Sequence, residues 1–213
     1  MGKSGARGEF PVPVIGLTGV YCAGKNHVAR LLEERGLPVL DVDKLGHEAL
    51  ELEKDAVIAR FGPGLIGEDG RIDRRALGAK VFGKAAELAA LEGIVHPEVN
   101  RLTDRWIARC RGPCVINAAL LHRSSSFGSL AFIILVEAPW ITRLLRARRR
   151  DRLPFAEILK RLHSQKQFIP QYLSKNADIY RVYNRGLSGF CSRRRLRSLE
   201  RRIDTILARE GVR

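Results

Sequence analysis

The chain has 213 residues, of which 45% are hydrophobic, so it can bury the core of one compact domain and is not expected to be disordered. No apolar run approaches the roughly 20 residues that a membrane-spanning helix needs, so we do not expect a membrane protein. The net charge of +15, concentrated after residue 140, implies an anionic partner, either a phosphate-rich small molecule or a nucleic acid, unless it reflects an arginine-rich composition with no role.

Residues 1–11 are expected to form a loose leader. The apolar stretch that follows is interrupted by Pro11, Pro13 and Gly16, which argues against a signal peptide. The cysteines have neither the spacing of a metal site nor that of a disulfide framework, so we expect reduced thiols and a cytoplasmic protein. They are Cys22, Cys110, Cys114 and Cys191.

The chain then begins with a strand, a glycine-containing loop, a helix and a second strand. The apolar run 12–18 predicts the first strand, and the turn 19–24 follows it. Apolar residues recur at helical spacing over 28–32, and Gly36 ends that helix. The short apolar run 37–40 predicts the second strand. This order is typical of a βαβ unit, whose strands pair in parallel.

Helices and strands alternate along the rest of the chain. Residues 44–111 are mainly helical, with breaks at 61–64 and 68–70. The further expected strands are 114–117, 131–136 and 179–183, and the further expected helices are 142–151, 155–168 and 196–207. The alternation predicts an α/β fold in which a parallel sheet is flanked by helices.

A phosphate-binding motif lies between the first strand and the first helix. Residues 19–25 match G-x-x-x-x-G-K, which requires this context. Backbone N–H groups at a helix N-terminus bind anionic oxygens, the two glycines allow the sharp turn, and the lysine reaches the β- and γ-phosphates of ATP. The candidate ATP-binding residues are Gly19, Cys22, Ala23, Gly24, Lys25, Asn26 and His27.

The residue after Lys25 departs from this motif. A Ser or Thr hydroxyl normally reaches Mg²⁺ at that position, whereas this chain has Asn26, whose carbonyl is a longer and neutral ligand. We therefore expect metal binding that is weaker or differently arranged. The histidines lack ligand spacing, so no dedicated protein metal site is expected, and Mg²⁺ is expected to arrive with ATP near Asn26 and Asp41.

From about residue 14 to residue 186, several segments resemble the dephospho-CoA kinase family and occur in the same order. They are the opening strand and loop at 15–19, the D-x-D at 41–43, the DGRIDRRAL segment at 69–77, the LE…HP signature at 91–97, the lid positions Arg146, Arg150 and Gln165, and the AD…N pattern at Ala177, Asp178 and Asn184.

This resemblance implies a three-layer P-loop NTPase fold, with a parallel sheet flanked by helices, a helical acceptor-binding insertion and a helical lid. We expect a single domain over 1–213. Its expected parts are a core at 12–43, 112–142 and 173–213, an acceptor-binding helical region at about 44–111, and a lid at about 143–172.

The activity that the resemblance implies is ATP-dependent phosphorylation of the 3′-hydroxyl of dephospho-CoA, the last step of coenzyme A biosynthesis, with ATP and dephospho-CoA as partners. Asp43 is the implied catalytic acid, which accepts the proton of that hydroxyl or orients it. The implied catalytic set is Asp43, Lys25, Arg146 and Arg150, and the implied acceptor-binding set is Asp43, Arg74 and His96.

These residues also have structural explanations. Asp41 and Asp43 could instead cap a helix, Asp43 one that begins at Lys44, and the arginines of 143–152 could form a solvated basic face. His96 could be a polar residue at a helix end, and Arg74 could pair with neighbouring acids.

The departures from the family pattern bear on turnover more than on fold. Val20 and Cys22 replace loop glycines, Asn26 and His27 replace a Ser-Thr pair, and residues 117–123 lack the usual Pro and acid. The alternatives are therefore a degenerate member that binds nucleotide with little or no turnover, or a kinase for another nucleotide-like acceptor. Nucleic acid is expected to bind at most non-specifically, because no nucleic-acid-binding module is recognisable.

Overall fold

The computed structural model describes residues 10–121, 125–151, 153–164, 178–185 and 192–212. The chain forms two compact units. Residues 41–109 make up the helical unit, and the chain before and after them makes up the sheet unit. None of the described helices is both long enough and apolar enough to cross a membrane.

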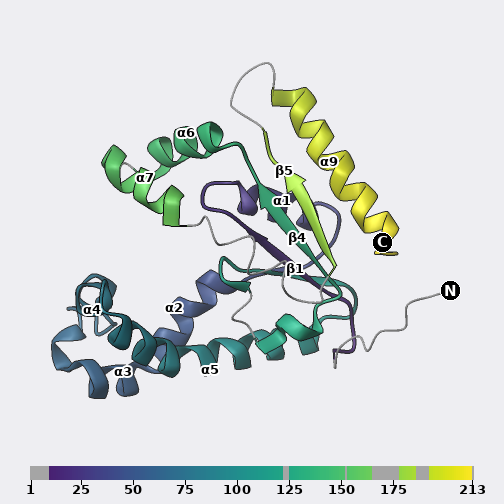
Figure 1. Ribbon diagram of the computed structural model, residues 1–213. Coiled ribbons are helices and arrows are strands. Elements are labelled where there is room, and N and C mark those ends of the chain that lie inside the picture. The colour runs from purple at the N-terminus through teal and green to yellow at the C-terminus, as the bar shows by residue number, and fades with distance from the viewer. Residues whose placement is uncertain (1–9, 122–124, 152, 165–177, 186–191, 213) are drawn as a thin grey trace. The chain divides into compact units, whose positions relative to one another are not determined.

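Among the described residues, five strands form one sheet (Figure 1). They are β1 (Val14–Gly19), β2 (Val39–Asp41), β3 (Cys114–Asn117), β4 (Phe132–Glu137) and β5 (Ile179–Tyr183), in the order β2-β3-β1-β4-β5. The pairs β1–β3, β1–β4 and β4–β5 are parallel. Strands β1, β3 and β4 are buried along their whole length, and their sequences are mainly apolar. The predicted parallel sheet is confirmed.

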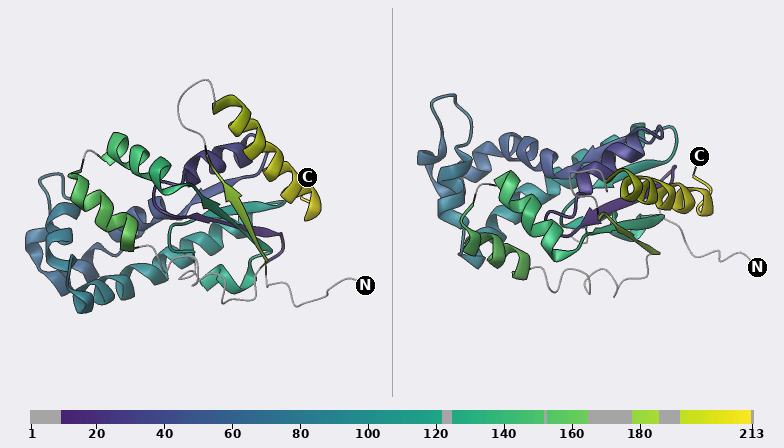
Figure 2. Two further views of the ribbon diagram at one scale, coloured as in Figure 1. Left: turned by 45° about the horizontal axis from the view of Figure 1, so that its top comes forward. Right: turned by 90° about the horizontal axis from the view of Figure 1, so that it is seen from above.

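Helices of the sheet unit flank this sheet. They are α1 (Lys25–Glu33), α6 (Trp140–Asp151), α7 (Phe155–Ser164) and α9 (Ser192–Arg209), and a 3-10 turn, η3, spans Ser125–Ser129. Helix α1 packs on β1 and β3, and α9 packs on β5. These two helices lie side by side (Figure 2), where Arg35 Nε donates to Asp204 Oδ1 over 2.5 Å.

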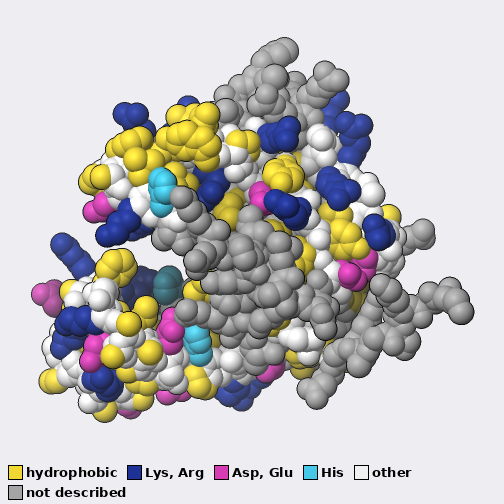
Figure 3. Space-filling model, in the orientation of Figure 1, with side chains coloured by type: hydrophobic (Ala, Val, Ile, Leu, Met, Phe, Trp, Pro, Cys, Tyr) yellow, Lys and Arg dark blue, Asp and Glu magenta, His cyan; other side chains and the backbone are white. Residues whose placement is uncertain are grey.

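The surface of the sheet unit differs from one helix to the next. Hydrophobic side chains gather over α6, whereas Lys and Arg side chains lie over β5 and α9 (Figure 3). Trp140, Ile141 and Leu145 are among the exposed hydrophobic residues of α6. Most of the basic residues of the C-terminal third that the structure describes belong to α6 and α9.

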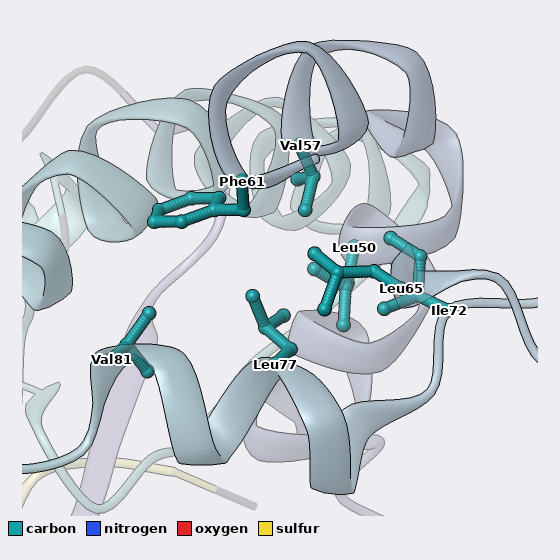
Figure 4. Close-up of a cluster of buried hydrophobic side chains, with 7 residues drawn as sticks. All are labelled: Leu50, Val57, Phe61, Leu65, Ile72, Leu77 and Val81. Atoms are coloured by element: carbon teal, nitrogen blue, oxygen red, sulfur yellow. The ribbon is translucent and has the colours of Figure 1, made fainter. Parts of the chain in front are cut away.

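The helical unit has its own apolar core. Its elements are α2 (Val42–Leu52), α3 (Lys54–Phe61), the 3-10 turn η1 (Pro63–Leu65), α4 (Arg74–Val81) and α5 (Ala85–Arg109). Seven buried side chains from these helices and their connections point toward one another: Leu50, Val57, Phe61, Leu65, Ile72, Leu77 and Val81 (Figure 4). Asp73 starts α4, because its carboxylate accepts the N–H groups of Arg75 and Ala76 at 2.8 and 3.1 Å.

The strand ends position the functional side chains of the sheet unit. Parallel strands present their carboxyl ends at one edge of a sheet, and ligands bind there in open α/β folds. Gly19, Asn117, Glu137 and Tyr183 are the last residues of β1, β3, β4 and β5. The turn from β1 to α1 begins at the same edge.

Candidate active site

The turn between β1 and α1, residues 19–25, is called the phosphate loop below. Both motif glycines are required by close contacts. A Cβ at Gly19 would lie 2.7 Å from the Val136 carbonyl oxygen, and a Cβ at Gly24 would lie 2.2 Å from Asn184 Nδ2. Gly24 is the N-cap of α1 and has a φ of 94°. N–H groups in the first turn of a helix have no intrahelical acceptor, so this loop can bind anionic oxygens.

Cys22 occupies the middle of the phosphate loop with a φ of 59°, a left-handed conformation that is unusual for a residue with a side chain. The sequence departs from the family pattern at this position, yet the loop keeps a turn that glycine would adopt without strain. The cost of such a conformation is about 1–2 kcal/mol. Burial raises the pKa of the Cys22 thiol, so the thiol is protonated at neutral pH.

Arg146 binds the backbone of the phosphate loop. Its Nη1 donates to the carbonyl oxygens of Cys22 and Ala23 at 3.2 and 2.7 Å. Its Nη2 donates to the carbonyl oxygen and Oδ1 of Asn184 at 3.3 and 3.1 Å, and Asn184 Nδ2 donates to the Ala23 carbonyl oxygen at 3.0 Å. Burial lowers the pKa of Arg146, but a guanidinium stays charged at neutral pH. This candidate catalytic residue therefore holds the loop in shape.

Further side chains of α6 contact the loop at Tyr21. Arg143 Nε donates to the Tyr21 carbonyl oxygen at 2.8 Å, and the Tyr21 hydroxyl donates to the Asp151 carboxylate. Arg150 binds Asp151 through Nε at 2.5 Å and lies over the Tyr21 ring, with its Cζ 5.3 Å from the centroid. The hydrogen bond from Arg150 holds the pKa of Asp151 below its usual range. In this structure the candidate Arg150 is thus engaged by Asp151 and Tyr21.

Two carboxamides meet beside the start of α1. Asn117, at the end of β3, is 2% exposed, and its Nδ2 donates to Asn26 Oδ1 over 3.5 Å. Among the described residues, Asn117 Oδ1 is the buried side-chain atom that has no hydrogen-bond partner. Asn117 is not among the candidates predicted from the sequence, although it is the first residue of the segment 117–123 that departs from the family pattern. Burial lowers the pKa of neighbouring His27, so that ring is neutral at pH 7.

These carboxamides could face a divalent cation, but only with neutral oxygens. Mg²⁺ prefers oxygen ligands and commonly keeps several of its waters. The described residues contain no group of three or more His, Cys, Asp or Glu side chains that could hold a metal ion. One of those waters could donate a hydrogen bond to the unpartnered Oδ1 of Asn117. Asn26 and Asn117 therefore fit a cation that keeps its water shell.

A cavity of about 360 Å³ lies beside the phosphate loop. It is lined by the ends of β4 and β5 and the start of α6: Val20, Glu137, Ala138, Pro139, Thr142, Arg143, Tyr183 and Arg185. Arg181 binds the Glu137 carboxylate with two hydrogen bonds of 2.7 and 2.9 Å, so a guanidinium balances the charge of that carboxylate. These lining residues could not be predicted from the sequence, because no motif spacing links the ends of β4 and β5 with the start of α6. The cavity can accept a planar base next to a bound phosphate chain.

Four candidates lie in the helical unit. Asp43 is in the first turn of α2, which begins at Val42, and Asp41 is its N-cap. The alternative that Asp43 caps a helix beginning at Lys44 is therefore wrong. Asp41 makes no side-chain capping bond, and its carboxylate lies 4.0 Å from Lys44 Nζ.

The other two candidates of the helical unit also differ from their structural explanations. His96 lies inside α5, directly before Pro97, and not at a helix end. Arg74 is the exposed first residue of α4, and within the described residues it forms no ion pair with Asp69 or Asp73. The family positions Gln165 and Ala177 lie outside the described residues.

Comparisons with known proteins agree on one family. The family model described as dephospho-CoA kinase matches residues 13–179. A dephospho-CoA kinase of Treponema pallidum (strain Nichols) is 36% identical over 211 residues, which cover 94% of this chain and 96% of that protein. A dephospho-CoA kinase of Thermus thermophilus is 35% identical over 205 residues, covering 96% and 94%.

Solved structures share the fold of this chain. The crystal structure of TT1252 from Thermus thermophilus matches with a TM-score of 0.75 and 34% identity, covering 93% of this chain and 97% of that one. A shikimate kinase from Bacteroides thetaiotaomicron matches with a TM-score of 0.52 at 12% identity, covering 92% and 98%, which is a likeness of fold alone. The resemblance inferred from the sequence and the P-loop kinase fold are confirmed.

Proposed function

Because the chain belongs to the dephospho-CoA kinase family, we propose that it transfers the γ-phosphoryl group of ATP to the 3′-hydroxyl of dephospho-CoA, giving CoA and ADP. The observation that carries this proposal is the phosphate loop. Its carbonyl oxygens are bound by Arg146 and Asn184, and α1 starts at its end. A loop fixed in this way presents N–H donors to a phosphate chain without having to reorganise.

The roles follow from the chemistry of phosphoryl transfer. The 3′-hydroxyl oxygen forms a bond to the γ-phosphorus, the bond from that phosphorus to ADP breaks, and the hydroxyl proton passes to the carboxylate of Asp43. We assign Lys25 to the β- and γ-phosphates and Arg74 and His96 to the acceptor. Arg146 acts as a positioning residue for the loop, and Arg150 can exchange Asp151 for a phosphate.

We assign the adenine of ATP to the cavity beside the phosphate loop. The Tyr183 ring lines this cavity, and the guanidinium carbons of Arg181 and Arg185 lie 5.7 and 5.8 Å from its centroid. Aromatic rings and guanidinium planes stack on bases, and the volume of about 360 Å³ accommodates a purine.

Mg²⁺ is the cation that we propose to accompany ATP. When bound, it neutralises charge on the β- and γ-phosphates. Asn26 and Asn117 are the side chains of the sheet unit that would hold it, through their carboxamide oxygens and its waters.

The test is CoA formation by the purified protein from ATP and dephospho-CoA, measured by chromatography with adenosine and AMP as alternative acceptors. We expect CoA and ADP in equal amounts and little product from the other acceptors. If the protein phosphorylates adenosine or AMP faster than dephospho-CoA, then dephospho-CoA is not its preferred acceptor.

A second candidate function is nucleotide binding without turnover. The neutral pair Asn26 and Asn117 favours it, because a P-loop kinase normally places a hydroxyl and an acid near its metal. Calorimetric binding of ATP together with no detectable CoA would support this function and exclude the first.

A further inference from the structure

Asn26 and Asn117, called the carboxamide pair below, remove a negative charge that most P-loop NTPases place near the metal. In P-loop NTPases the hydroxyl after the motif lysine and an acid at a neighbouring strand end hold Mg²⁺. In this chain the position after Lys25 is Asn26, and the end of β3 is Asn117. The two side chains contact each other over 3.5 Å, so both changes lie at one place. The two carboxamides themselves carry no formal charge, although Lys25 directly precedes Asn26.

The surroundings of the phosphate loop are rich in positive charge. Arg143 and Arg146 bind carbonyl oxygens of the loop, and Lys25 is the first residue of α1. The strand-end acid Glu137 is bound by Arg181 through two hydrogen bonds. In the described part of the sheet unit, fixed cations can therefore balance the charge of a triphosphate.

The unpartnered oxygen of Asn117 indicates that the pair faces a ligand. Buried polar atoms almost always have a partner, and an exception in a native fold requires an explanation. Asn117 is 2% exposed, and its Oδ1 has no donor within the described residues. A water carried by a bound cation or phosphate would supply that donor.

We propose that Asn26 and Asn117 make nucleotide binding by this chain nearly independent of divalent cation. Neutral oxygens neither attract Mg²⁺ strongly nor repel a metal-free triphosphate, whereas an acid at position 117 would do both. This inference rests on the proposed binding of ATP at the loop. It concerns affinity and leaves the metal requirement of phosphoryl transfer unchanged.

The test is the dissociation constant of ATP, measured by isothermal titration calorimetry in excess Mg²⁺ and in EDTA. For the wild-type protein we expect the two constants to agree within about threefold. In the double variant Asn26→Ser/Asn117→Asp, the ratio of the dissociation constant in EDTA to that in Mg²⁺ should be at least about tenfold larger than in the wild type. The main reason is that ATP binding in EDTA weakens. The matched control Thr205→Asp adds the same charge on the exposed face of α9 and should keep the wild-type ratio.

The outcomes separate the inference from the function. Wild-type binding that weakens more than about tenfold in EDTA would overturn the inference while leaving the proposed function standing. No ATP binding under either condition would overturn both. Should the buried Asn117→Asp change prevent folding, judged by circular dichroism, the wild-type ratio and the exposed Asn26→Ser variant still decide. If the ratio of the dissociation constants in EDTA and Mg²⁺ is no larger in Asn26→Ser than in the wild type, the proposed role of Asn26 and Asn117 is contradicted.

Discussion

The phosphate loop and the helical unit are stabilised in opposite ways. The loop is held by polar side chains that bind its backbone, chiefly Arg146 and Asn184. The helical unit is held by a cluster of apolar side chains, while its candidate functional residues Asp43, Arg74 and His96 lie outside that cluster. Changes at the loop should therefore affect nucleotide binding and turnover, whereas changes in the apolar cluster should affect folding.

Lys25→Ala should have the largest effect on function. Loss of the ammonium group at the β- and γ-phosphates should lower kcat for CoA formation by about 10³-fold, because this charge acts where the transferred group gains charge. The free energy of unfolding should change little. Arg202→Ala, an exposed change on α9, is the control and should keep the wild-type rate. A Lys25→Ala rate close to that of the wild type would remove the loop from the mechanism.

Phe61→Ala tests the other side of the comparison. Phe61 is 7% exposed in the apolar cluster, so its truncation should lower the free energy of unfolding by about 3–5 kcal/mol. The matched variant Phe82→Ala removes a ring that is 86% exposed, and its effect should be within about 0.5 kcal/mol. Denaturant titration measures both. Equal effects at the two positions would mean that the cluster does not stabilise the unit.

Arg146→Ala should weaken ATP binding by about 10-fold to 100-fold, because charge-assisted hydrogen bonds of about 1.5–3 kcal/mol hold the loop carbonyls. The dissociation constant and KM for ATP should rise more than kcat falls, as expected for a positioning residue. Arg146→Lys should remain impaired, because an ammonium group cannot reproduce the planar fork. Arg148→Ala on the exposed part of α6 is the control. An effect on kcat alone would instead assign Arg146 to the transition state.

The smallest effect concerns Cys114, at the start of β3. Burial raises the pKa of its thiol to about 12, so the folded state keeps a proton that the unfolded chain loses near pH 8.5. This contribution to stability is complete below about pH 8.5 and is lost as the pH rises through about 12. Cys114→Ala should therefore make the free energy of unfolding fall less steeply above pH 8.5. Val115→Ala, at a buried neighbour that does not titrate, should keep the wild-type slope.

Much of the fold could be predicted from the sequence. The apolar runs marked β3 and β5 with their observed boundaries, and the motif placed the phosphate loop between β1 and α1. These features could be predicted because each is determined by residues that are close together in the sequence. The effect of Asn26 on metal binding, which the sequence also predicts, stays a prediction.

The contacts that define the site could not be predicted in the same way. Arg146 binds carbonyl oxygens more than 120 residues earlier in the chain, and Asn117 meets Asn26 across 91 residues. Spacing rules do not reach that far. The start of α2 at Val42 was also missed, because Asp43 before a helical pattern is a good N-cap by composition.

The most direct test of the account is the rate of CoA formation by Asp43→Asn beside that of the wild-type protein. We predict that the wild type converts ATP and dephospho-CoA to CoA and ADP. We predict a rate about 10²–10⁴ times lower in Asp43→Asn, because the carboxylate no longer accepts the hydroxyl proton. The control Asp55→Asn changes an acid in the first turn of α3 and should match the wild type. A normal rate in Asp43→Asn, or a wild-type protein that binds ATP and forms no CoA, would contradict the account.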